Sequence, residues 1–311
     1  MEKNLYIDAS HPNETRIVLK SNNSIEEYEF EDKNNLNFKN NIYLATVSRV
    51  EPSLQAAFVN FGRERHGFLA FNDIQSDYYQ IPSEDKDKLK IAEEKIREDL
   101  KDNVTEAVQD IASTELTSND IVDKTEDKTK EDSTDELKDD NKKNYREKVK
   151  SSFGIKRYKI QEVIKPGQVI LIQVIKEERG QKGAALTTFI SLAGKYIVLM
   201  PNTAKGGGIS RKIFNSSDRQ KIRNILNEID IPKSMGVIVR TAGANKTKNE
   251  IQKDFQNTIS TWEEIKNNAL DSNAPSLVYE EGDIIKRTLR DTYDNETKNV
   301  YIEGNEAYQK A

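Results

Sequence analysis

Cysteine is absent from the chain, and no run of apolar residues approaches the roughly 20 that a membrane-spanning helix needs. The lack of cysteine excludes a disulfide framework, a thiolate zinc site and a cysteine nucleophile, and it suits a reducing compartment. The first ten residues, MEKNLYIDAS, also lack the apolar core of a signal peptide. We therefore expect a soluble, cytoplasmic protein without a membrane segment.

Hydrophobic residues are scarce as well, at 35% of the 311 residues, while charged residues reach 32%. The net charge of −5 is unevenly spread: residues 84–150 hold 22 Asp and Glu against 15 Lys and Arg, which leaves +2 for the rest. This segment has no proline or glycine and a single aromatic residue, Tyr145, so it has too little apolar bulk to offset the entropy of ordering. We expect residues 83–155 to be a disordered acidic insertion, and a solvated spacer is favoured over a protein-binding segment.

Short strands are predicted on both sides of the insertion, because apolar and polar residues alternate between turn-forming strings. Residues 5–8, 16–20 and 26–30 form a first antiparallel meander. Five further strands are expected at residues 42–50, 55–61, 67–71, 168–175 and 184–190. Five short strands with a long excursion between the third and the fourth are typical of an OB barrel.

Beyond residue 191 the pattern changes to mixed α and β. Residues 218–229 and 247–270 carry apolar side chains at helical spacing, and Ser216 or Ser217 is the expected cap of the first helix. Trp262 falls on the apolar face of the second helix, which favours a core position over ligand stacking. A strand is expected at 235–240, and two strands joined by a turn are expected between 276 and 303.

Aromatic and basic residues gather in the string EPSLQAAFVNFGRERHGFLAF. Aromatic side chains on a barrel face can stack on nucleic-acid bases while guanidinium groups hold the backbone. The alternative is that all four phenylalanines are core, and alternation along the strands requires this of some of them. The residues concerned are Phe58, Phe61, Phe68 and Phe71, with Arg63, Arg65 and His66 beside them.

The string NIYLATVSRVEPSLQAAFVNFGRERHGFLAF resembles the RNA-binding barrel of the ribonuclease E/G family of endoribonucleases. The later strings KEERGQKGAALTTFISLAGKYIVLMPNTAKGGGISRKI and MGVIVRTAG resemble the same family in the same order. The resemblance implies a mixed α/β chain, in which an OB barrel and an α/β 5′-sensor domain are inserted in an incomplete ribonuclease H-like scaffold. It divides the chain into residues 1–37 and 276–311 for the scaffold, 38–190 for the barrel and 191–275 for the sensor. Insertions at this barrel loop resemble those of α-proteobacterial ribonuclease E.

The resemblance also implies two groups of binding residues. Single-stranded RNA would contact Phe58, Phe68 and Lys182 on the barrel, where Lys182 stands in RGQKG between glycines that permit close approach to a phosphate. A 5′-monophosphorylated RNA end would be bound by a second group, Val198, Arg211, Arg240 and Thr241. A guanidinium fork and a hydroxyl at the end of a strand suit a terminal phosphate, which offers more oxygens than an internal one.

Catalysis in this family requires magnesium held by carboxylates, and assembly of a homo-oligomer requires zinc held by a CPxC motif; both belong to segments expected beyond residue 311. We therefore assign no catalytic residue and no metal ligand. Asp291, Asp294 and Glu296 are interpreted as solvated residues of a turn. Three hypotheses remain: the RNA-binding half of an endoribonuclease that needs a separate catalytic half, a non-catalytic RNA-binding protein, and an unrelated translation-type OB module.

Overall fold

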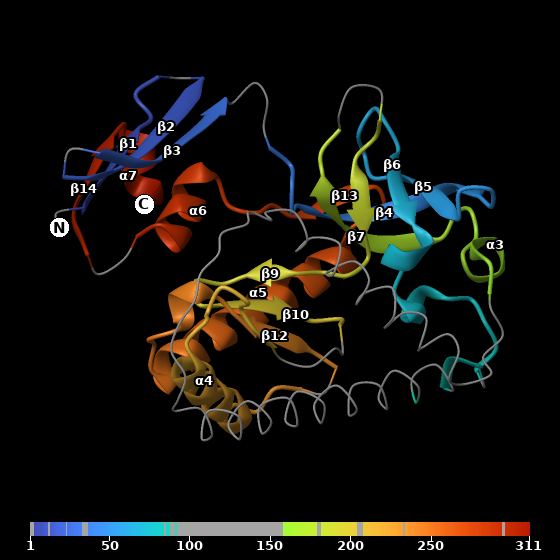
Figure 1. The fold of residues 1–311 in the computed structure, drawn as a ribbon. Coiled ribbons are helices and arrows are strands. Elements are labelled where there is room, and N and C mark those ends of the chain that lie inside the picture. The colour runs from blue at the N-terminus through green and yellow to red at the C-terminus, as the bar shows by residue number, and fades with distance from the viewer. Residues whose placement is uncertain are drawn as a thin grey trace, which may run out of the picture.

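In the computed structural model of the chain, the described residues form three β-sheets (Figure 1). Each sheet has its own buried core. The structure describes residues 3–11, 13–22, 24–32, 37–83, 85–87, 91, 158–178, 182–203, 208–232, 234–293 and 296–311. Almost all of the predicted acidic insertion, residues 83–155, lies outside the described residues, so its disorder stays a prediction. The domain boundaries stay predictions as well.

The largest sheet closes into a five-stranded barrel, as expected for an OB-like fold. Its strands follow the order β4-β5-β6-β8-β7, and pairing of β4 with β7 completes the closure, while β13 extends the sheet beyond β4. The bounds are Ile42–Glu51 for β4, Ala56–Asn60 for β5, Gly67–Ala70 for β6, Val169–Lys176 for β7, Ala185–Thr187 for β8 and Ser276–Tyr279 for β13. Strand β6 pairs with β8 in parallel, whereas the other neighbours within the barrel are antiparallel.

The interior of the barrel is filled by every second residue of its strands, as the side-chain period of two requires. Val47, Val59, Leu69, Ile172 and Leu186 are all at most 1% exposed. Short helices accompany the barrel among the described residues. They include the 3-10 helices η2 (Phe71–Asp73) and η3 (Ser76–Tyr78) and the α-helix α3 (Ile160–Val163), which buries Ile160 and Val163 in the barrel core.

A second sheet has the order β11-β12-β10-β9 and packs against two helices. Its elements are β9 (Leu192–Ala193), β10 (Ile197–Met200), β11 (Gly208–Ile209), α4 (Ser216–Glu228), β12 (Gly236–Val239), the 3-10 helix η4 (Thr241–Gly243) and α5 (Lys248–Asp271). Both predicted helices are present, but the cap of α4 is Asn215, whose side chain accepts from the Ser217 N–H; the expected cap at Ser216 or Ser217 is wrong. Trp262 packs against the core, as predicted.

The third sheet joins the two ends of the chain in the order β14-β1-β2-β3. The predicted meander is β1 (Lys3–Asp8), β2 (Glu14–Ser21) and β3 (Ser24–Asp32), and β14 (Thr297–Glu303) lies parallel to β1. Figure 1 shows the blue first strands and the red last strand side by side. Two helices, α6 (Ile284–Asp291) and α7 (Asn305–Lys310), contribute Ile284, Ile285 and Ala307 to its core.

The simple turn predicted between the last two strands is wrong, because α6 stands there. Asp283 caps this helix by accepting from the Lys286 N–H, and Ile284, Ile285 and Thr288 form its buried face. The helix has only 8 residues, so its apolar spacing was too short to distinguish a helix from a turn.

Candidate functional site

One candidate site is a row of side chains across the outer face of the barrel. Arg49 on β4 pairs with Phe58 on β5, and Phe58 pairs with Phe68 on β6. The Arg49 guanidinium carbon lies 4.4 Å from the centre of the Phe58 ring, and the Phe58 and Phe68 rings meet edge to face at 6.1 Å. Phe68 is 36% exposed. The row therefore presents two accessible aromatic rings with a cation at one end.

The other two phenylalanines of the same string are not part of this row. Phe61 is 1% exposed in the barrel core, and Phe71 is partly buried and stacks on Tyr79. The alternative that all four rings are core is therefore wrong, and the expected division between core and surface is found.

Lys182 is exposed and precedes the strand that runs beside Phe68. The Phe68 N–H donates to the Ala184 carbonyl at 2.7 Å. A Cβ on the intervening Gly183 would lie 2.2 Å from the His66 carbonyl oxygen, so only glycine allows the two backbones to approach this closely. The structure thus brings Lys182 to the same edge of the barrel as Phe68.

The second candidate site lies where β12 ends in the second sheet. Val198 on β10 pairs with Ile238 on β12, two residues before Arg240. On the other side of β12, the Ser210 N–H donates to the Val239 carbonyl, which places Arg211 beside the end of the strand. Arg211 and Thr241 are exposed. The four predicted residues are therefore close in the sheet, although no hydrogen bond joins their described side chains.

Arg240 is the best-defined member of this group, because its guanidinium group is held from two sides. Nη1 donates to the Gly194 carbonyl at 2.8 Å and to Oδ1 of Asp291 at 2.6 Å. The turn that carries Gly194 is itself fixed by Asp254 on α5, whose carboxylate accepts from the N–H groups of Lys195, Tyr196 and Ile197.

Comparison with known proteins tests one of the three hypotheses raised by the sequence, that of an unrelated module. The family model described as "Ribonuclease E/G family" matches residues 191–311. Ribonuclease E of Haemophilus influenzae is 32% identical over 99% of this chain and 26% of its own length, and ribonuclease E of Escherichia coli is 33% identical over 97% and 22%. The chain belongs to the ribonuclease E/G family.

This membership removes the hypothesis of an unrelated translation-type module. The chain spans about a quarter of the length of the two ribonuclease E relatives, 26% and 22%. What a complete ribonuclease E/G protein does is consequently a proposal for this chain.

The interpretation of Asp291 as a turn residue is wrong, although the residue is exposed, as expected. Asp291 ends α6 and pairs with Arg240, and it also accepts from Nε and Nη2 of Arg290 at 3.0 and 2.9 Å. Glu296 is largely exposed and pairs with Lys3 at 3.0 Å, whereas Asp294 lies outside the described residues. Sequence reasoning missed Arg290 and Asp291 as neighbours of the candidate site, and the local pattern RDTYDNET held no signal of a partner 51 residues away.

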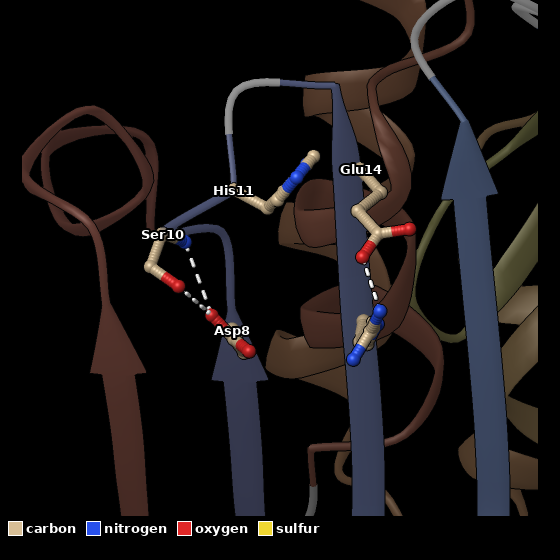
Figure 2. A pocket seen from close by; sticks show the side chains of 5 residues that line it. Asp8, Ser10, His11 and Glu14 are labelled. Atoms are coloured by element: carbon tan, nitrogen blue, oxygen red, sulfur yellow. Dashed lines mark hydrogen bonds and ion pairs between the residues drawn. The ribbon is translucent and has the colours of Figure 1, made fainter.

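A shallow pocket between β1 and β2 holds Asp8, Ser10, His11, Glu14 and Arg16 (Figure 2). The Ser10 hydroxyl and N–H donate to Asp8 at 2.6 and 3.0 Å and lower the pKa of this carboxyl, and Glu14 pairs with Arg16. His11 accepts from the Asn13 N–H. Each of these polar groups has a partner within the protein, so we assign the pocket no function. Across the residues that the structure describes, no three His, Asp or Glu side chains form a group able to hold a metal ion.

The described helices give no sign of a membrane segment. None of them is both long enough and apolar enough to cross a bilayer.

Proposed function

We propose that residues 1–311 bind and select single-stranded RNA for a ribonuclease E/G-type endoribonuclease that acts in RNA processing and mRNA decay. The observation that carries this proposal is the outward row of Arg49, Phe58 and Phe68 on the barrel of a ribonuclease E/G chain. Bases of a single strand can stack on such rings whatever their sequence, while cations at the edge attract the phosphates.

If the barrel binds RNA, replacing an aromatic residue and replacing the lysine should change RNA affinity and its salt dependence in different ways. Phe58→Ala or Phe68→Ala should weaken binding of a single-stranded oligonucleotide by about 1–3 kcal/mol, and the dependence on salt should hardly change, because stacking is lost but charge is not. Lys182→Ala should instead lower the slope of log K against log salt by about one. A fluorescence titration at several salt concentrations measures both quantities.

The matched control is Tyr28→Ala, which removes a ring that is 58% exposed on β3, away from the barrel. RNA affinity should stay at the wild-type value in this variant. Wild-type affinity in folded Phe58→Ala and Phe68→Ala proteins would remove the barrel face from the proposal.

We further propose that the end of β12 recognises the 5′-monophosphate of an RNA. Arg240 and Thr241 follow a strand whose backbone is fixed on both sides, so a guanidinium group and a hydroxyl can be directed at one ligand. Arg211, exposed beside them, adds a second cation. A terminal phosphate carries a charge between −1.5 and −2 at neutral pH, so a charge-assisted fork favours it over a 5′-hydroxyl end.

Arg240→Ala should abolish the preference for a 5′-monophosphorylated oligonucleotide over the same oligonucleotide with a 5′-hydroxyl. Hydrogen bonds to charged groups contribute about 1.5–3 kcal/mol, which corresponds to a preference of roughly 10- to 150-fold. This preference should be lost in the variant, while its affinity for the 5′-hydroxyl form stays the same. The control is Arg223→Ala, which removes an arginine from α4 of the same sheet unit. Equal affinity of the folded wild-type chain for the two oligonucleotides would refute this proposal.

The third sheet supports a ribonuclease H-like scaffold around these binding units. Its order β3-β2-β1-β14, with β14 parallel to β1, joins residues from both ends of the chain into one sheet.

Metal-assisted hydrolysis is the chemistry that the family resemblance implies. Among the described residues, no group of carboxylates fits the magnesium ion, and Asp291 is paired with two arginines. The sequence contains no cysteine for the zinc motif. A separate catalytic part, a homo-oligomer and a cytoplasmic location stay predictions.

A further inference from the structure

The guanidinium group of Arg240 is attached to the protein through one nitrogen only. Nη1 carries two hydrogens, and both are used, one by the Gly194 carbonyl at 2.8 Å and one by Asp291 at 2.6 Å. Among the described residues, nothing accepts a hydrogen bond from Nε or Nη2 of Arg240. The edge formed by Nε and Nη2 therefore remains available for a bidentate contact with two oxygens of one ligand.

Asp291 is in turn held by Arg290, which also binds Oδ1, the oxygen that accepts from Arg240. Nε and Nη2 of Arg290 hold its two oxygens, and Nη1 of Arg290 donates to Glu281 at 3.1 Å and to the Ala193 carbonyl at 3.3 Å. Burial acts to raise the pKa of Asp291, but the hydrogen bonds from Arg290 and Arg240 outweigh it, and the pKa lies below its ordinary value. The carboxylate is therefore charged and has a defined orientation.

We propose that Asp291 is a positioning residue for recognition of the RNA 5′-phosphate: by holding Nη1 of Arg240, it directs the free Nε–Nη2 edge toward the phosphate. This inference rests on the proposed function of Arg240. It also gives the third sheet a role, because α6 carries Asp291 from that unit to the end of β12. Without Asp291, the arginine side chain would lose rotamer restriction and would have to regain it on binding.

The opposite role would be competition, in which Asp291 occupies the place of the phosphate and weakens its binding. Two observations favour positioning. Asp291 contacts the nitrogen that also binds the Gly194 carbonyl, not the free edge. Its charge is balanced by the bidentate contact with Arg290, which reduces its repulsion of a phosphate.

The two roles predict opposite changes in the preference for a 5′-monophosphorylated oligonucleotide when Asp291 is replaced by alanine: positioning predicts a decrease and competition predicts an increase. Positioning predicts that the preference of the 311-residue chain for a 5′-monophosphorylated over a 5′-hydroxyl oligonucleotide falls by about tenfold, because a charge-assisted contact loses its preorganisation. The 5′-hydroxyl affinity should stay within about twofold. In an Arg240→Ala background, Asp291→Ala should have no further effect on the preference, since the residue acts through Arg240.

The matched control is Glu31→Gln, which changes a carboxylate that binds Arg287 and the Ile284 N–H of the same helix but makes no described contact with Arg240. It should leave the preference unchanged, and thermal melting should give a folded protein for each variant. A wild-type chain with no preference for the 5′-monophosphorylated oligonucleotide would refute the proposed recognition of the 5′-monophosphate itself. A wild-type preference that persists or increases in folded Asp291→Ala would overturn only the positioning role, and an increase would assign competition instead.

Discussion

Phe61→Ala is expected to lower the free energy of unfolding of the chain by about 3–5 kcal/mol, the range for truncating a buried phenylalanine. The Phe61 ring is 1% exposed, meets Tyr43 edge to face at 5.2 Å and lies 6.4 Å from the Phe38 ring. The strands around it close on themselves, so the barrel can collapse only partly into the space that the ring leaves. Urea unfolding, followed by circular dichroism, measures the difference in the free energy of unfolding between Phe61→Ala and the wild type.

Phe58→Ala is the matched control, because it removes the same ring from a position three residues away on the outer face. The free energy of unfolding should fall by only about 1 kcal/mol in Phe58→Ala, since the Phe58 ring contacts Arg49 and Phe68 but not the barrel interior. Equal destabilisation by the two substitutions would mean that Phe58 is also a core residue, and RNA-binding data for Phe58→Ala would then report on folding.

The division of these phenylalanines could be predicted from the sequence only in part. Alternation requires that Phe58 and Val59 point to opposite sides of β5, and it requires the same of Phe68 and Leu69 on β6. It cannot say which side faces the interior, because both sides of these strands carry apolar residues. The structure decides this through register, which pairs Phe58 with Phe68 and leaves Val59 and Leu69 inside.

The strands of the first meander and of the barrel, and the two long helices, were predictable because each repeats its pattern over several residues. The contacts of Arg240 were not, because its partners Gly194 and Asp291 lie 46 and 51 residues away in the sequence. They meet only when α6 of the third sheet approaches the turn after β9. The family resemblance indicated Arg240, but the carboxylate that orients it becomes visible only through tertiary packing.

Asp254→Ala is expected to lower the free energy of unfolding by roughly 3 kcal/mol, because several backbone donors lose a charged acceptor together. The Asp254 carboxylate accepts from the Lys195, Tyr196 and Ile197 N–H groups at 3.1, 2.8 and 3.0 Å. A Cβ at Gly194 would lie 2.6 Å from the same carboxylate, so the turn fits closely around it. Thermal or urea unfolding measures the loss of stability.

The same substitution should also reduce the preference for a 5′-monophosphorylated RNA, since the turn supplies the Gly194 carbonyl that holds Arg240 and the Ala193 carbonyl that holds Arg290. Glu263→Ala, which removes an exposed carboxylate from α5, should change neither stability nor preference. Asp254→Asn keeps one carbonyl oxygen as an acceptor and should fall between wild type and Asp254→Ala. A destabilised Asp254→Ala protein that retains the full preference would show that the guanidinium group of Arg240 is oriented without the turn.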